Sequence, residues 1–376
     1  MASYQDDYGL IDKALHYFAF KTTGLQLAMA NNESQEHEAK LKSIKLDKPV
    51  FITSLPRSGT TVLLDVLAKT GVFSYHTYQD MPFVFTPMIW AKFTRLFAKD
   101  DTLRERAHKD GIKINQYSPE AFEEMLFKAF WPQAYRGVAI EPWSEEANAK
   151  FDRFFIDHMK KLILRDDADV VTASQQRRYI SKNNLNVTRL PYLKRLLPDC
   201  LLVIPFREPV QHALSLLKQH GNFTAMHQHN KFSQDYMAAI GHFDFGVNLK
   251  PMNFNGWFER SRFTPDSADF WLEYWCQTYQ YLLDGCVEGN SEGNSEGNSE
   301  DKLFVGFEQL CQQPKHSFEL LAERLSIDPQ TLQQSIPMIK VAKTHPIEMN
   351  LLDQQNVATA KALYQRLLGL AIATVN

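Results

Sequence analysis

The chain has 376 residues, 44% of them hydrophobic and 23% charged, with a formal net charge of −3. This composition excludes a wholly disordered chain, and the nearly balanced charge gives no sign of a general nucleic-acid binder. The longest apolar runs, such as residues 201–206, are far shorter than the roughly 20 residues that cross a bilayer. An acidic N-terminus and four cysteines without a C-x-x-C pair predict a cytoplasmic protein with reduced thiols.

The first half of the chain is predicted to be mostly helical. Residues 1–47 carry an imperfect helical stripe of apolar side chains, and residues 49–53 form an apolar, β-branched run that predicts a buried strand. After a breaker-rich turn, helical apolar spacing runs from Thr60 to Thr70 and stops at Gly71. A mostly helical, aromatic-rich block over residues 82–169 follows, in which Ser118-Pro119-Glu120 predicts a helix start.

The second half alternates strands with helices. Two strands are predicted at 178–181 and 200–206, with an amphipathic helix over 187–197 between them. The next helix is expected to run from Val210 to His220 and to end at Gly221. A helix starting at residues 264–266, whose aromatic rows are expected to pack in the core, a strand at 303–307 and C-terminal helices follow. Three copies of Glu-Gly-Asn-Ser within residues 287–301 predict a disordered acidic loop.

Short apolar strands that alternate with helices predict a parallel sheet covered on both faces. We therefore expect a single α/β domain over residues 1–376, a three-layer α/β/α structure around a central parallel sheet, with the block over 82–169 as a large helical portion. Ligands of such sheets bind beyond the carboxyl ends of the strands. The polar loops after Thr53, Ser181 and Phe206 are predicted to lie there.

The strongest motif is residues 55–61, which read LPRSGTT between a predicted strand and a predicted helix. Gly59 allows backbone amides to turn toward an anion, and the helix N-terminus adds a partial positive charge. The hydroxyls of Ser58, Thr60 and Thr61 and the guanidinium of Arg57 supply further donors. The motif predicts a site for a phosphate-like group, and a Ser/Thr-rich helix cap is the alternative interpretation.

The motif differs from the phosphate loop of nucleotide triphosphatases, G-x-x-x-x-G-K-[ST]. When the two are aligned on Gly59, the first glycine falls on Ser54 and the lysine falls on Thr60. Without that lysine, and with no aspartate at a strand end to bind a metal, hydrolysis of ATP or GTP is not favoured.

A second anion site is predicted from Arg207 and Ser215. Arg207 follows a strand, and Ser215 lies eight positions later in the next helix. An arginine and a hydroxyl directed at one place suit a second phosphate, although Arg207 could instead pair with Glu208 and Ser215 could be an ordinary helix serine. Two phosphate sites at one sheet edge would indicate a nucleotide phosphorylated at two positions.

These motifs resemble the sulfotransferase superfamily, which uses 3′-phosphoadenosine 5′-phosphosulfate (PAPS) as its donor. The resemblance implies a P-loop-like fold, with Arg57 to Thr61 around the 5′-phosphosulfate and with Arg207 and Ser215 at the 3′-phosphate. It is closest to a group of bacterial sulfotransferases, on the segments YQDMPF at 78–83, SPEAFEE at 118–124 and SKNN at 181–184. The vertebrate cytosolic members have lysine at the position of Arg57 and K-x-H at the position of Lys182 to Asn184.

The resemblance also assigns catalytic roles. Sulfuryl transfer depends on positioning and on charge stabilisation, so Arg57 and Lys182 are expected to stabilise the leaving group without a metal. Asp80 is expected to be the base, with a helix N-cap as its alternative role. His76 is the runner-up, because histidine titrates near neutral pH. Glu120 and Glu124 could face the acceptor, which the helical block over 82–169 would help to enclose.

Other interpretations of the same loops stay open. An ATP-dependent kinase or phosphotransferase would require magnesium, and a catalytically silent protein could bind the nucleotide alone. The histidines close together in sequence lack a zinc-ligand spacing, so no metal site is predicted and His212 or His220 is expected near the nucleotide. The acceptor is expected to be a small molecule, glycan or lipid, with no nucleic-acid partner and no membrane span; the oligomeric state is open.

Overall fold

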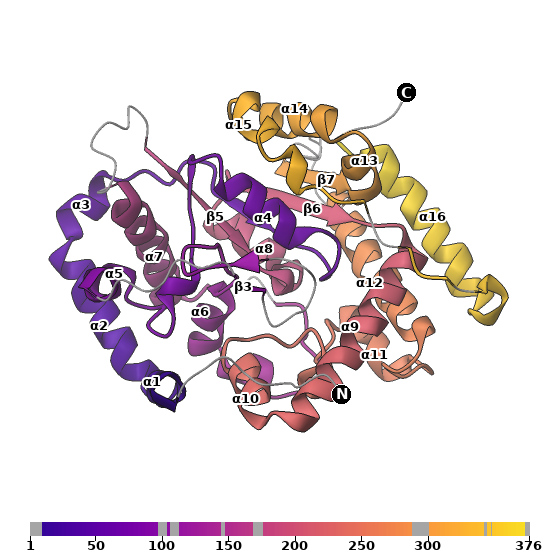
Figure 1. The fold of residues 1–376 in the computed structure, drawn as a ribbon, viewed down its shortest axis with the longest axis horizontal. Helices are drawn as coiled ribbons and strands as arrows, with labels where there is room; N and C mark the ends of the chain where they lie inside the picture. Colours follow the sequence, from indigo (N-terminus) through magenta and orange to yellow (C-terminus); the bar gives the residue numbers. More distant parts are fainter. Residues whose placement is uncertain are drawn as a thin grey trace.

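The computed structural model describes residues 10–96, 104–105, 113–143, 147–167, 176–287, 301–341, 344–346 and 348–372. Within these residues, five strands form a central sheet in the order β2-β5-β1-β6-β7, and every neighbouring pair is parallel. Strands β5, β6 and β7 of this sheet are labelled in Figure 1. The strands are β1 Val50–Ile52, β2 Phe73–Ser74, β5 Arg178–Lys182, β6 Leu201–Phe206 and β7 Lys302–Gly306. The predicted parallel sheet is confirmed. Strand β2 escaped prediction because two residues are too few to show a period.

Helices cover both faces of the sheet, because alternate strand side chains enter two separate cores. Val50, Ile52 and Val203 share one core with α4 Thr60–Ala68, α13 Phe307–Gln312, α14 Pro314–Leu325 and α15 Pro329–Gln333. Phe51 and Leu202 share the other with α7 Ala149–Asp167, α8 Leu190–Leu196, α9 Pro209–His229, α12 Ala268–Val287 and α16 Gln354–Leu370. The three-layer α/β/α prediction is confirmed.

The remaining elements lie around this sandwich. The N-terminal helices, on the left of Figure 1, are α1 Leu10–Lys21, α2 Thr23–Glu36 and α3 Glu38–Ser43. The block over 82–169 contains α5 Pro87–Leu96, α6 Glu123–Phe130 and a two-stranded antiparallel sheet, β3 Arg104–Glu105 with β4 Lys113–Ile114. Two short helices, α10 Lys231–Ala239 and α11 Trp257–Arg260, follow α9. The aromatic rows of α12 are buried, as predicted.

Three predicted boundaries are wrong. Residues 118–120 do not start a helix, because Pro119 forms a bridge with Thr77 and α6 begins only at Glu123. Gly221 does not end α9, which continues to His229 because Phe223 and Met226 are buried and hold the extra turns in place. The helix predicted over 187–197 begins instead as a 3₁₀ turn, Asn184–Arg189, before α8.

The Glu-Gly-Asn-Ser repeats, residues 288–300, lie outside the described residues. None of the helices in the described ranges combines the length and the apolar character that crossing a bilayer requires.

Candidate active site

Three loops leave the sheet next to one another at its carboxyl edge. Ile52, the last residue of β1, is aligned with Lys182 of β5 and with Val203 of β6. Just beyond, the Asn183 amide donates to the Ile52 carbonyl at 3.0 Å, and the Thr53 amide donates to the Val203 carbonyl at 3.0 Å. The strand register therefore brings the loops that follow these three strands to the same edge.

The loop after β1 has a conformation that requires glycine at position 59. Gly59 has φ +104°, and a Cβ there would lie 2.6 Å from the Phe307 ring, so both the backbone and the space exclude a larger residue. Arg57, which is partly buried, also has a positive φ of 69°. Non-glycine residues adopt this region at an energetic cost and do so most often at functional sites. The hydroxyl of Ser58 donates to the Leu55 carbonyl at 2.7 Å and stabilises the turn from within.

Tyr279 of α12 joins the ends of β1 and β6. Its hydroxyl lies 2.7 Å from Ser54 Oγ and donates to the Pro205 carbonyl at 3.1 Å, and all three groups are buried. Tyr279 therefore connects the start of the loop after β1 to strand β6. The sequence predicted Tyr279 only as a core residue.

The two predicted anion sites lie in direct contact. Arg207 Nη1 donates to the carbonyl of Arg57 at 3.4 Å. His212, one turn into α9, has its Nε2 2.8 Å from the Pro56 carbonyl, so Nε2 must carry the ring proton. Burial, together with the nearby Arg207 and Arg57 cations, lowers the pKa of His212 to about 3, which keeps the ring neutral. His212 therefore supports the loop as a donor, near the site where the sequence predicted a histidine.

Ser215 is buried on the same face of α9 as His212, because residues three apart lie one above the other on a helix. The structure thus brings the predicted residues 57–61, Arg207 and Ser215 to one region. Thr60 and Thr61 form the first turn of α4, with Thr60 buried and Thr61 partly buried.

Two residues after β7 position Arg207. The Phe307 ring that packs on Gly59 also lies 5.6 Å from the Arg207 guanidinium carbon, and Glu308 Oε1 is 3.7 Å from Arg207 Nε. Burial raises the pKa of Glu308, although Arg207 opposes that effect. Phe307 and Glu308 stand next to the site because Gly306 is aligned with Phe206. This alignment between two strand ends is the signal from which Phe307 could have been found.

Lys182 is the last residue of β5, not a loop residue beyond it, and it is buried. It lines a small pocket with Glu124 of α6, with Asn184, and with His242 and Asp244 from the turn after α10. Since Lys182 is aligned with Ile52, it stands next to the end of β1, from which the loop that carries Arg57 starts.

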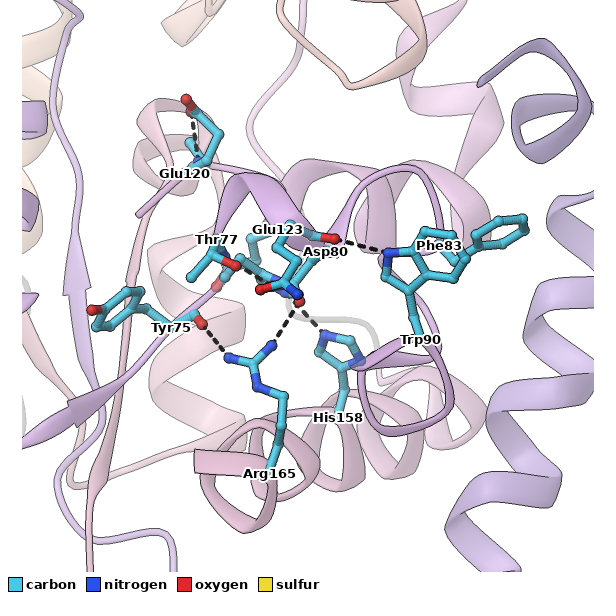
Figure 2. Close-up of polar contacts among 12 residues, drawn as sticks. Tyr75, Thr77, Asp80, Phe83, Trp90, Glu120, Glu123, His158 and Arg165 are labelled. Carbon is cyan, nitrogen blue, oxygen red and sulfur yellow. Dashed lines mark hydrogen bonds and ion pairs between the residues drawn. The ribbon is translucent and has the colours of Figure 1, made fainter. Parts of the chain in front are cut away.

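Asp80 lies elsewhere, in a buried cluster with Arg165 (Figure 2), and His76 is a buried member of the same cluster. Asp80 Oδ1 is 2.7 Å from Arg165 Nη1, and its Oδ2 accepts from the Thr77 amide at 2.8 Å and lies 3.2 Å from His76 Nδ1. Burial would raise the pKa of Asp80, but Arg165, His76 and the Thr77 amide together hold it below its usual value. Asp80 is not itself an N-cap: Thr77 is the N-cap of the 3₁₀ turn Tyr78–Asp80, and Asp80, as its third residue, closes a capping box with it.

His76 is likewise engaged on both ring nitrogens. Its Nε2 lies 3.0 Å from His158 Nε2. The pKa of His158 is well below its usual value, mainly because the ring is buried and also because His76 lies next to it. The structure therefore joins His76 and Asp80 to each other and to α7, and it does not bring them to the Lys182 pocket.

Glu120 and Glu124 have different surroundings. Glu120 Oε1 accepts from the amide of the next residue, Ala121, at 2.7 Å, and its side chain points away from Asp80 in Figure 2, although its own amide donates to the His76 carbonyl at 2.9 Å. Glu124 does line the Lys182 pocket, but Arg189 donates to both of its oxygens at 2.8 Å. Asn183 donates to Glu124 Oε2 at 2.7 Å, and the Tyr135 hydroxyl donates to Oε1. Glu124 is thus part of a satisfied buried network.

The chain matches a sulfotransferase family in sequence. The family described as "Sulfotransferase family" matches residues 49–249, more than half of the chain. No curated protein matches its sequence. Among solved structures, sulfotransferase STF1 from Mycobacterium tuberculosis H37Rv is 13% identical, with a TM-score of 0.45 over 90% of this chain and 81% of that one.

Two further structures are similar at the same level. Sulfotransferase STF9 from Mycobacterium avium is 11% identical, with a TM-score of 0.49 over 93% of this chain and 83% of that one. A retinol dehydratase, solved in complex with androsterone and the inactive cofactor PAP, is 12% identical, with a TM-score of 0.34 over 90% of this chain and 85% of that one.

Proposed function

This chain belongs to the sulfotransferase family, and from that premise we propose that it transfers the sulfuryl group of PAPS to a hydroxyl or amine of an acceptor. The observation that carries this proposal is the contact between the two predicted anion sites, where Arg207 Nη1 donates to the Arg57 carbonyl at 3.4 Å. A donor phosphorylated at both its 5′ and 3′ positions needs two such sites close together.

In the proposed complex, residues 57–61 bind the 5′-phosphosulfate through their backbone amides, hydroxyls and the Arg57 guanidinium. Arg207 and Ser215 bind the 3′-phosphate, with the His212 ring supporting the loop between the two groups. The α4 N-terminus adds its partial positive charge to the first site.

The acceptor oxygen or nitrogen would attack sulfur in line, while the bond between sulfur and the 5′-phosphate oxygen breaks. Negative charge develops on that oxygen, and preorganised cations next to it stabilise the transition state more than the ground state. Lys182 and Arg57 are proposed for this role, because Lys182 is aligned with the strand that leads into the Arg57 loop. The acceptor itself is proposed to be a small molecule or an exposed group of a glycan or lipid.

Calorimetric titration tests which nucleotide the protein binds. We expect 3′-phosphoadenosine 5′-phosphate (PAP) to bind without added metal and ATP with magnesium to bind much more weakly. PAPS should be converted to PAP when an acceptor such as 4-nitrophenol is present. Binding of ATP with magnesium alone would contradict the proposal in favour of phosphoryl transfer, and tight PAP binding without turnover on any acceptor would indicate a silent nucleotide-binding protein.

A further inference from the structure

The small pocket at the end of β5 contains two titratable groups, His242 and Asp244, that have no proposed role in donor binding. Its lining includes Lys182, Glu124, His242 and Asp244, which come from three different parts of the chain. The pocket is linked to the donor side through Asn184, whose carbonyl accepts from Thr53 Oγ1 at 3.3 Å. A group bound in this pocket would therefore lie next to the loop that is proposed to hold the phosphosulfate.

The turn that carries His242 is packed closely against α6. Gly241 has φ +83°, and a Cβ there would lie 2.4 Å from Glu124 Cγ, so only glycine allows this approach. The His242 amide donates to the Met237 carbonyl at 2.8 Å, and Lys128 of α6 donates to the Ala238 carbonyl. These contacts fix the His242 backbone at the pocket wall.

Among the titratable groups of this pocket, the contacts leave His242 and Asp244 as candidate proton acceptors. Glu124 is saturated, since Arg189, Asn183 and Tyr135 all donate to its two oxygens. Lys182 is a cation and can only donate. Asp244 Oδ2 accepts from Asn184 Nδ2 at 3.2 Å and lies 4.0 Å from His242 Nδ1. At 4.0 Å this is an ion-pair contact and not a hydrogen bond. An ordinary histidine side chain titrates closer to neutral pH than a carboxyl group does, which favours His242 over Asp244 as the base.

We propose that His242 is the general base of the transfer and that Asp244, held by Asn184, is the residue that positions its ring. This inference rests on the proposed function. The acceptor hydroxyl gives its proton to Nε2 as its oxygen bonds to sulfur, and the electron pair of the breaking sulfur–oxygen bond goes to the 5′-phosphate of PAP. Asp244 stabilises the imidazolium, and Lys182 and Arg57 stabilise the phosphate.

The test compares wild type with His242→Asn, His242→Gln and Asp244→Asn, with His316→Gln as the matched control. His316 is an exposed residue of α14, far from the pocket in sequence and on the helix layer of the other core. PAPS turnover to PAP is measured between about pH 5.5 and 8.5, a range centred near the ordinary histidine pKa, with an unactivated phenol as acceptor, because its own pKa of about 10 keeps the hydroxyl protonated over this range. PAP affinity is measured by calorimetry on each variant.

We expect both His242 variants to lose roughly 10²–10⁴-fold in turnover, the usual contribution of a general base, while PAP affinity stays unchanged. The rise of the wild-type rate with pH should disappear. In Asp244→Asn that rise should move to lower pH, because the imidazolium loses its nearest carboxylate. The other charged residues that line the pocket are Glu124 and Lys182, and Lys128 donates to the Ala238 carbonyl in the turn before His242; all three remain in every variant. The control should behave as wild type.

A second measurement does not depend on turnover. In protein labelled with ¹⁵N-histidine, the ring signals of His242 should titrate at lower pH in Asp244→Asn than in wild type. An unchanged midpoint would overturn the pairing with Asp244. Normal PAP binding and normal turnover in His242→Asn would overturn the assignment of His242 as the base and leave the proposed function standing. A wild-type protein that binds no PAP would refute the proposed function and this inference with it.

Discussion

At the scale of single residues, the donor site depends on one close approach. Gly59 lies against Phe307, and the same ring lies beside the Arg207 guanidinium. One aromatic side chain therefore lies beside both anion sites. Replacing Gly59 would disturb both sites at once, because the added Cβ would have to displace this ring.

We expect Gly59→Ala to lower the free energy of unfolding by more than about 1 kcal/mol and to weaken PAP binding, since alanine is strained at positive φ and clashes with Phe307. Gly221→Ala is the matched control, because no atom lies within 4 Å of its Cβ and it stands inside α9. That variant should gain about 0.4–1 kcal/mol. Urea unfolding measures the free energy of unfolding of both variants. If Gly59→Ala had the stability of wild type, the loop would not be constrained in this way.

Arg207→Ala should weaken PAP binding by about 1.5–3 kcal/mol, the range for a hydrogen bond to a charged group. Arg207→Lys should recover only part of this, because an ammonium cannot reproduce the two-pronged guanidinium contact. Calorimetry with PAP measures the change, and Arg195→Ala serves as the control because its contacts are to Asp152 on α7. Unchanged PAP affinity in Arg207→Ala would move the 3′-phosphate site elsewhere.

At the scale of elements, α6 connects the two sides of the proposed acceptor pocket. Its first turn supplies Glu123 and Glu124, which accept hydrogen bonds from Asn186 and Asn183 after β5. Its last turn supplies Lys128, which donates to the carbonyl at the end of α10 and lies 5.5 Å from the Phe243 ring centre. The helix therefore holds the β5 loop and the His242 turn at once.

The Lys128 contact predicts a pH dependence of stability. Burial lowers the pKa of Lys128 from its usual 10.5 to about 8. Between these two values the unfolded chain binds a proton that the folded chain has released, so stability rises with pH. The difference in unfolding free energy between wild type and Lys128→Met should therefore increase from pH 8 to about 10.5. A difference that stays flat or falls over this range would contradict the shifted pKa.

At the scale of the whole molecule, the N-terminal helices are joined to the sandwich by a buried ion pair. Lys161 of α7 lies 3.1 Å from Glu33 of α2, and both side chains are fully buried. Lys161 also donates to the Ala30 carbonyl at 2.9 Å, and Glu33 accepts from the Ile89 amide of α5 at 2.6 Å. One pair of side chains thus ties together three helices that are far apart in sequence.

Lys161→Met should lower the free energy of unfolding by about 3–5 kcal/mol, because it leaves the Glu33 carboxylate buried without a counter-charge. Adding Glu33→Gln should restore part of the loss, since a neutral amide can still accept from the Ile89 amide. Lys42→Met, which breaks an exposed pair with Glu38, should cause no measurable change. Equal effects of the buried and exposed variants in urea unfolding would contradict this account.

The sequence predicted well those features that depend on neighbouring residues. The strands at Val50 and Leu201, the glycine turn at Gly59 and the helix that follows it all have local signals, because periodicity and backbone preference act over a few residues. The resemblance to sulfotransferases rested on these same segments. Gly221 was misread because buried side chains beyond it outweigh the weak helix preference of glycine.

The sequence by itself determined the three layers, the phosphate-type loop and the two arginines proposed to bind the donor. Only the tertiary structure decided that β1 lies between β5 and β6, that Asp80 is occupied by Arg165, and that His242 faces the pocket of Lys182. The physical reason is that these placements depend on contacts between residues about 60 to 150 positions apart. Such contacts leave no periodic trace in the chain, so they become visible only once the helices and strands are packed.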